Sequence, residues 1–267
     1  MTDSAASPLQ VTGTALGGSH DAPLLLLGPS LGTPASTLWR DCAAHLATSF
    51  RVIAWDLPGH GRSARTRGPL RVETLAAAVR AIADEVSPDR PFHVAGDSLG
   101  GAVTLQLALD APERVASVTA LCTGARIGTT ESWRERAATV RASGTGAVVT
   151  ASAARWFGPG FIEREPAVAA ALLDGLAATD AESYAGACEA LATFDVVDRL
   201  PQITAPVLAI AGSADAPTPP ESLRTIAEQV TDGHLVVLDG VGHLAPAEAP
   251  AEVARLIGEH ATTEGSR

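Results

Sequence analysis

The chain has 267 residues, a formal charge of −11 and a hydrophobic content of 46%, with 25 glycines and 18 prolines. This length can bury the core of one large α/β domain, with room for a small inserted subdomain, and the composition is too apolar for a disordered chain. The negative charge argues against a nucleic-acid partner, because phosphates would not be neutralised. It leaves the charge of a substrate open, since a pocket can be basic within an acidic protein.

No apolar run is long enough to cross a bilayer, and the longest, from Pro23 to Gly28, is predicted to be one buried strand. The first residues show no basic stretch followed by an apolar one, so we expect no secretory signal, no membrane association and a cytoplasmic location. Cys42, Cys122 and Cys188 are odd in number and widely spaced. Buried free thiols are therefore expected, rather than a disulfide framework or a metal site.

Short runs rich in valine, isoleucine and leucine alternate with longer segments of helical periodicity. Strands are predicted at residues 10–15, 24–28, 51–56, 92–96, 117–122, 207–211 and 234–238. Helices are predicted between and after them at residues 36–47, 72–85, 99–109, 221–229 and 251–259. This alternation is typical of an α/β fold with a mostly parallel sheet and helices on both faces.

Residues 123–200 interrupt the alternation, because no strand is predicted there. Alanine-rich helices are predicted instead at residues 131–142, 147–156, 167–177 and 183–191. We interpret the segment as a helical cap inserted into a core made of residues 1–122 and 201–267. Trp133, Trp156 and Tyr184 lie in the segment, and their rings either roof a pocket or fill the core of the cap itself.

The strongest local motif is Gly96-Asp97-Ser98-Leu99-Gly100, which lies between an apolar strand and a helical run. In this setting G-x-S-x-G is typical of a nucleophile elbow, a sharp turn that exposes the serine hydroxyl. The glycines allow a close approach of the backbone, and the N-terminus of the helix favours negative charge nearby. Ser98 is therefore the predicted nucleophile, and Asp97 is predicted to be a carboxylate of the turn.

A serine becomes a good nucleophile only when a base removes its proton, and His243 is the best-placed base. It follows the last predicted strand and precedes the last helix, so it can lie at the carboxyl edge of the sheet. His60 is the one rival. Its loop follows Asp56, and we expect it to stabilise that turn.

Asp215 is predicted to orient the imidazole and to stabilise its charged form, because it follows the predicted strand at 207–211 closely. Ser98, Asp215 and His243 then follow one another in the chain order expected for a nucleophile elbow at the edge of such a sheet. The alternatives, none of which follows a strand end so closely, are Asp195, Asp198 and Asp239.

An oxyanion formed at Ser98 needs two backbone N–H groups. One is expected from Leu99, directly after the nucleophile. The other is expected from Leu31, in the loop that follows the strand at 24–28.

These motifs resemble the α/β-hydrolase family over nearly the whole chain, including the loop at residues 56–63. The closer resemblance is to the 3-oxoadipate enol-lactonases of the β-ketoadipate pathway. It lies in residues 28–33, 111–114 and 211–220 and in the cap segments 123–128, 133–141, 155–157 and 179–186. Such lactonases commonly carry methionine at the position of Leu99 and a neutral residue at that of Asp97. Leucine in place of methionine at position 99 leaves the backbone N–H of that residue unchanged.

The resemblance implies a serine hydrolase that opens 3-oxoadipate enol-lactone through an acyl-enzyme and needs no metal or organic cofactor. Its substrate is a small anionic lactone, whose carboxylate would pair with an arginine of the cap. The candidates are Arg126, Arg134, Arg136, Arg141 and Arg155. Arg136 is the first choice, with Trp133 packing over the lactone, because residues three apart share one face of a helix. The alternative is that these arginines form a solvated face.

The same three residues would also serve a carboxylesterase, a methyl esterase or a carbon–carbon bond hydrolase, so they do not select the substrate. A ligand receptor built on a hydrolase fold is an alternative from another class. The sequence leaves the oligomeric state open.

Overall fold

The structure is a computed structural model that describes residues 9–66 and 68–264. Its centre is a seven-stranded sheet with the strand order β1-β3-β2-β4-β5-β6-β7. The strands are β1 (Thr12–Gly17), β2 (Leu24–Gly28), β3 (Arg51–Asp56), β4 (Phe92–Asp97), β5 (Val115–Leu121), β6 (Val207–Gly212) and β7 (Gly233–Leu238). Only β1 runs antiparallel to its neighbour, so the carboxyl ends of the other six strands meet at one edge of the sheet.

Three inner strands of the sheet are buried along their whole length. Every residue of β2, β4 and β6 is buried, which is expected for parallel strands covered on both faces. The edge strands β1 and β7 are only partly covered. The apolar runs of the sequence therefore mark the centre of the sheet, where the core packs most densely.

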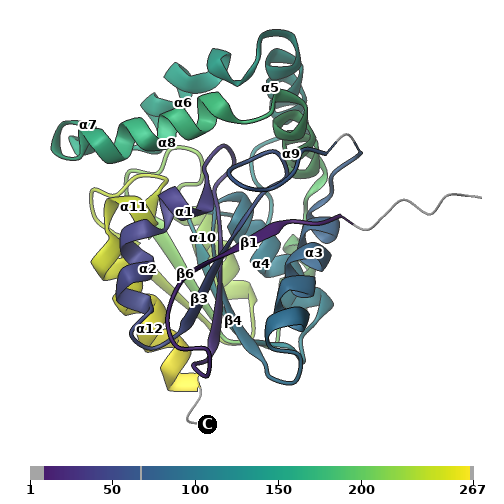
Figure 1. Cartoon of the computed structure of the whole chain (residues 1–267), viewed down its shortest axis with the longest axis vertical. Helices are drawn as coiled ribbons and strands as arrows, with labels where there is room; N and C mark the ends of the chain where they lie inside the picture. Colours follow the sequence, from purple (N-terminus) through teal and green to yellow (C-terminus); the bar gives the residue numbers. More distant parts are fainter. Residues whose placement is uncertain (1–8, 67, 265–267) are drawn as a thin grey trace, which may run out of the picture.

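Helices cover the two faces of this sheet (Figure 1). On one side α2 packs against α12, and on the other α3 packs against α4. The helices that belong to the core with this sheet are α1 (Ala35–Leu38), α2 (Arg40–Leu46), α3 (Val72–Val86), α4 (Leu99–Asp110), α10 (Pro220–Gln229), α11 (Ala245–Glu248) and α12 (Pro250–Glu264). The predicted α/β class with a mostly parallel sheet is confirmed.

A second group of helices lies between β5 and β6 in the chain and gathers at one end of the molecule (Figure 1). These helices, which we call the cap, are α5 (Thr130–Ser143), α6 (Val149–Trp156), α7 (Phe161–Arg164), α8 (Pro166–Ala178) and α9 (Ala181–Thr193), with short 3₁₀ turns η1 (Thr145–Val148) and η2 (Val197–Gln202). The described residues between β5 and β6 form no strand. The exact division at residues 122/123 and 200/201 stays a prediction.

Two predicted elements differ from the structure. The helix expected at 36–47 is broken at Trp39, whose backbone leaves the helical region and whose indole N–H donates to the carbonyl of Gly28 at 2.9 Å. The helix is interrupted at Trp39, where the buried indole N–H forms a hydrogen bond to the last residue of β2, because a buried N–H needs an acceptor. The first strand lies at Thr12–Gly17, two residues later than predicted.

Within residues 9–66 and 68–264, no helix is long and apolar enough to span a membrane. The first eight residues, on which the expectation of no secretory signal was based, lie outside the described part of the chain.

Two glycines allow β4 and α4 to meet at a sharp angle. A Cβ atom at Gly96 would lie under 3.0 Å from backbone atoms of Gly100 and Gly101. A Cβ atom at Gly100 would approach the backbone of Gly28 and Pro29 equally closely. Since these neighbours are backbone atoms, no side chain can move aside to make room.

We expect Gly96→Ala to lower the free energy of unfolding by about 2–4 kcal/mol, because the added methyl group must displace the start of α4. Gly258→Ala is the matched control, since its Cβ would meet no atom within 4 Å in the middle of α12. That change should raise the free energy of unfolding by about 0.5–1 kcal/mol through helix propensity. Urea unfolding measures both, and equal effects would contradict the packing at the turn.

Candidate active site

Ser98 occupies the turn between β4 and α4 in a strained backbone conformation, with φ 54° and ψ −114°. The turn is held from both sides. The Ser98 N–H donates to the carbonyl of Leu121 at 2.9 Å, and the Ser98 carbonyl accepts from the hydroxyl of Thr123 at 2.7 Å. A non-glycine residue adopts a positive φ only when its surroundings enforce it, and such strain is common at functional sites.

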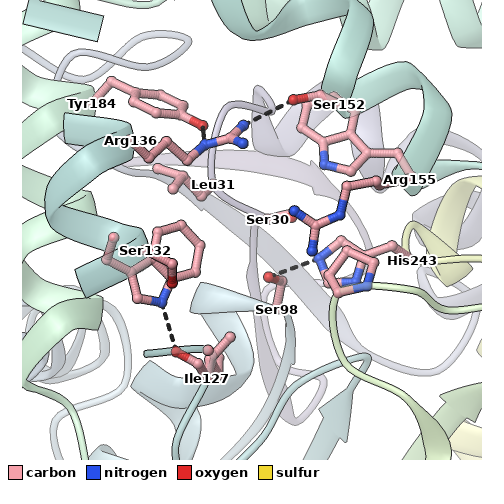
Figure 2. Close-up of a pocket in the computed structure, with 14 residues that line it drawn as sticks. Ser30, Leu31, Ser98, Ile127, Ser132, Arg136, Ser152, Arg155, Tyr184 and His243 are labelled. Atoms are coloured by element: carbon pink, nitrogen blue, oxygen red, sulfur yellow. Dashed lines mark hydrogen bonds between the residues drawn. The ribbon is translucent and has the colours of Figure 1, made fainter. Parts of the chain in front are cut away.

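The structure brings Ser98, Asp215 and His243 together at the carboxyl edge of the sheet. His243, in the loop between β7 and α11, places Nε2 2.9 Å from Oγ of Ser98 (Figure 2). Its Nδ1 lies 3.0 Å from both carboxylate oxygens of Asp215, in the loop after β6. The imidazole therefore links the hydroxyl to the carboxylate, as a general base and its orienting acid require.

Asp215 has further partners that keep it charged and oriented. The backbone N–H of Thr218 donates to Oδ1 at 2.9 Å, and the Thr218 hydroxyl donates to Oδ2 at 2.8 Å. Burial by itself would raise the pKa of Asp215, but His243 and these hydrogen bonds together hold it below its usual value. The site thus contains a buried carboxylate that can stabilise positive charge on the imidazole.

Leu31 and Leu99, the predicted oxyanion donors, both lie beside Ser98 in the fold. Leu31 lines the same pocket as Ser98, and Leu99 is the first residue of α4. In the part of the chain that the structure describes, neither backbone N–H has an acceptor among the protein atoms. Both amides are therefore available to a bound ligand.

A pocket of about 190 Å³ opens above Ser98 and His243 (Figure 2). The core contributes its floor, which also includes Ser30, Leu31 and Pro217. The cap contributes its walls and roof, through Trp133, Arg136, Ser152, Arg155, Trp156 and Tyr184 among others. The three large rings that the sequence placed in the cap thus all line the pocket.

Of the five cap arginines considered as partners for a substrate carboxylate, two line this pocket, Arg136 and Arg155. The other three do not. Arg126 pairs with Asp195, and Arg141 pairs with two glutamates, all at exposed positions. Arg134 is exposed.

Arg136 is fixed in place by cap residues. Its Nε donates to the hydroxyl of Tyr184 at 2.7 Å, and its Nη2 donates to the hydroxyl of Ser152 at 2.8 Å (Figure 2). Both partners are neutral, so the positive charge of Arg136 is not cancelled by them. Arg155 has no hydrogen-bonding or ion-pairing partner among the described residues, and its guanidinium points towards Ser98 and His243 in Figure 2.

Trp133, predicted to pack over the substrate, does line the pocket, and its indole N–H donates to the carbonyl of Ile127 at 2.6 Å. Ser152, Ile127 and Pro217 also line it, although the sequence analysis did not select them. No local motif marks these three residues. Only their contacts in the folded chain reveal their place.

The rival candidates are engaged elsewhere. His60 is buried, with Nδ1 2.8 Å from the carbonyl of Pro58, and its ring stacks on Tyr184. Burial lowers the pKa of His60 to about 4, so the ring is neutral near pH 7. Asp239 accepts from the hydroxyl of Ser213, and Asp195 pairs with Arg126. Within the described residues, no three His, Cys, Asp or Glu side chains form a group that could hold a metal ion.

Asp97, directly before Ser98, is fully buried, and neither of its carboxylate oxygens has a hydrogen-bond partner among the described residues. Burial raises the pKa of Asp97 well above its usual value, and the nearby Asp215 and Glu248 raise it further. Burial without a hydrogen-bond partner therefore disfavours the charged form of this carboxyl group, which lies directly before the turn.

We expect the effect of Asp97→Asn on stability to depend on pH. Since the pKa of Asp97 is raised in the folded state, its contribution to stability is fully present below about pH 4, where an unfolded aspartate is protonated, and is lost as the pH rises towards the folded-state pKa. Asparagine stays neutral throughout. Relative to the wild type, the variant should gain free energy of unfolding in urea titrations as the pH rises above about 4, whereas a constant difference would contradict a raised pKa of Asp97.

Known proteins resemble this chain over most of its length. Residues 24–256 match the alpha/beta hydrolase family. The chain is 38% identical over 234 residues to 3-oxoadipate enol-lactonase 2 of Acinetobacter baylyi, an alignment that covers 87% of this chain and 86% of the relative.

Solved structures of similar proteins share the whole fold. The enol-lactonase from Burkholderia xenovorans LB400 superposes with a TM-score of 0.89 at 33% identity, covering 94% of this chain and 96% of the other. A thermophilic esterase from Thermogutta terrifontis, solved with malate bound, gives a TM-score of 0.88 at 26% identity, covering 95% and 93%. A match over most of the chain, together with the strand order, the turn at Ser98 and the inserted cap, shows that the chain belongs to the α/β-hydrolase family.

Proposed function

We propose that the protein hydrolyses 3-oxoadipate enol-lactone to 3-oxoadipate through a serine acyl-enzyme, as part of aromatic degradation by the β-ketoadipate pathway in the cytoplasm. The observation that carries the proposal is the hydrogen-bonded series Ser98–His243–Asp215 beneath a pocket that holds two arginines. Similarity to two enol-lactonases, over most of the chain, supports the choice of substrate.

In the first half of the reaction, His243 Nε2 removes the proton of Ser98 as Oγ attacks the lactone carbonyl. The amides of Leu31 and Leu99 stabilise the oxyanion, and Asp215 stabilises the imidazolium. The ring oxygen then leaves and takes the proton from His243. Because that oxygen belongs to the same molecule as the carbonyl, the leaving group stays attached to the acyl chain as an enol.

In the second half, His243 takes a proton from a water molecule, whose oxygen attacks the acyl-enzyme carbonyl. The tetrahedral intermediate collapses, Ser98 recovers its proton, and the product leaves with a new carboxylate. Tautomerisation of the enol gives 3-oxoadipate. These steps use only the side chains and amides named, without a metal or organic cofactor.

The substrate carries one carboxylate, for which Arg136 and Arg155 provide positive charge on the cap side of the pocket. Arg136 is preoriented by Tyr184 and Ser152, so little side-chain freedom is lost on binding. Trp133 supplies a ring that can pack over the lactone.

The alternative is a carboxylesterase or another small-ester hydrolase with the same three residues, which the similarity to the Thermogutta esterase favours. A neutral ester and the enol-lactone separate the two possibilities, since only the lactone needs the arginines. A receptor without turnover would bind the lactone and release it unchanged.

Ser98→Ala should lower the rate of enol-lactone hydrolysis by about 100-fold or more, because it removes the nucleophile and leaves only binding and the oxyanion donors. The measurement is the spectrophotometric loss of enol-lactone with purified protein. Ser143→Ala, at an exposed position at the end of α5, is the matched control and should keep wild-type activity. Near-wild-type activity of Ser98→Ala would rule out the proposed nucleophile.

Arg136→Ala and Arg155→Ala should each raise KM for the enol-lactone by about 10-fold or more, since each removes a charged contact to the carboxylate. KM for p-nitrophenyl acetate, which is neutral, should change little. Arg126→Ala is the control, because Arg126 lies on the surface beside Asp195. Equal losses on both esters would assign the arginines to the structure of the cap and favour the esterase alternative.

A further inference from the structure

The loop that carries His243 touches the cap through backbone atoms. The His243 N–H donates to the carbonyl of Trp156 at 2.7 Å, which joins the loop directly to the end of α6. A Cβ atom at Gly242 would lie under 3.0 Å from backbone atoms of Trp156, Phe157 and Gly158. The two segments are therefore in direct contact, and only glycine fits at this point.

Glu248, the last residue of α11, bridges the same two segments. Its Oε2 accepts from the N–H of Gly158 in the cap at 2.9 Å. Its Oε1 accepts from the N–H of Gly242 at 3.2 Å, one residue before His243. One carboxylate thus holds the catalytic loop with one oxygen and the cap with the other.

Residues of the core contact the carbonyl of Gly242. The Cys122 thiol lies 3.6 Å from the Gly242 carbonyl and can donate to it. Gly212, at the end of β6, would meet that same carbonyl if it carried a Cβ atom. With Glu248 on its N–H, Gly242 is held on both its polar groups, which limits the positions open to His243.

Glu248 is partly buried, and burial and hydrogen bonds act on its pKa in opposite directions. Burial raises the pKa of Glu248, whereas the N–H groups of Gly158, Gly242 and Leu244 and the nearby His243 oppose this change. Hydrogen bonds to a charged acceptor are stronger than those to a neutral one, so these N–H contacts favour the ionised form of Glu248 against the effect of burial.

The cap segment that Glu248 holds also contributes to the pocket. Arg155 and Trp156 come shortly before Gly158 in the chain, and both line the pocket above Ser98. A displacement of this segment would move them, and a displacement of Gly242 would move the base.

We propose that Glu248 is a positioning residue that fixes His243 and the Arg155–Trp156 wall of the pocket relative to each other. The inference rests on the proposed function for the role of His243 and for the anionic substrate. Glu248 touches no reacting atom. Its effect comes from geometry, since a displacement of about 1 Å in a catalytic site can cost about 100-fold in rate.

The test uses Glu248→Gln, Gly158→Ala and the double variant. Glutamine has the size of glutamate but offers one acceptor oxygen and one donor group, so it can satisfy only one of the two N–H groups. Alanine at 158 pushes the cap away from Glu248 and from the carbonyl of Gly240, without altering either. Glu252→Gln is the matched control, because Glu252 is exposed and pairs with Arg255 on α12.

We expect Glu248→Gln to lower kcat for p-nitrophenyl acetate by about 10- to 100-fold, through the base, and to raise KM for the enol-lactone, through the cap. Gly158→Ala should show both changes. The double variant should have about the same kcat and KM as the more impaired single variant, because both substitutions disrupt the same contact between Glu248 and Gly158. Glu252→Gln should behave as wild type.

The proposal would be overturned if folded Glu248→Gln kept the wild-type kcat for p-nitrophenyl acetate and the wild-type KM for the enol-lactone. It would also be overturned if only one of these two values changed, or if the fold-changes of the two single variants multiplied in the double variant. If Glu248→Gln does not fold, Gly158→Ala must show both changes by itself. If the wild type does not hydrolyse the enol-lactone, the proposed substrate is wrong. In that case kcat for p-nitrophenyl acetate still tests whether Glu248 positions His243. If p-nitrophenyl acetate is not turned over either, the rate at which phenylmethanesulfonyl fluoride sulfonylates Ser98 can be compared between the wild type and Glu248→Gln.

Discussion

The sharp turn at Ser98 is the constraint on which the rest of the site depends. It brings the hydroxyl to the carboxyl edge of the sheet, and it exists because Gly96 and Gly100 let the backbone of β4, α4 and β2 meet without Cβ atoms. Hydrogen bonds from Ser98 to Leu121 and from Thr123 to Ser98 then hold the strained residue. The strain is local, and the parallel strands on both sides provide the rigidity that maintains it.

The site contains two buried aspartates whose pKa values shift in opposite directions. The imidazole and Thr218 lower the pKa of Asp215, whereas Asp97 has no such partner among the described residues and burial raises its pKa. A second buried negative charge here would compete for the imidazolium that Asp215 is placed to stabilise. The difference in hydrogen-bond partners, rather than in residue type, separates the two roles.

The cap and the core form the pocket together, and neither part contains all of its groups. The core supplies Ser98 and His243, and the cap supplies Arg136, Arg155 and the aromatic rings. Backbone contacts at Trp156 and the bridge through Glu248 join the two parts beside the base. A cap can change between family members while the three core residues remain, which is why the family alone does not select the substrate.

Sequence by itself determined the parts that local patterns encode: the α/β class, the approximate strands and helices, the turn at Ser98, and the chain order of Ser98, Asp215 and His243. It made Arg136 the first choice among the five cap arginines, but it could not distinguish Arg155 from the surface arginines Arg126, Arg134 and Arg141. Nor could it select Ser152 and Glu248, or show that Asp97 has no partner. Those properties depend on contacts between residues far apart in the chain, such as the 145 positions that separate Ser98 from His243, and only the tertiary structure decides such contacts.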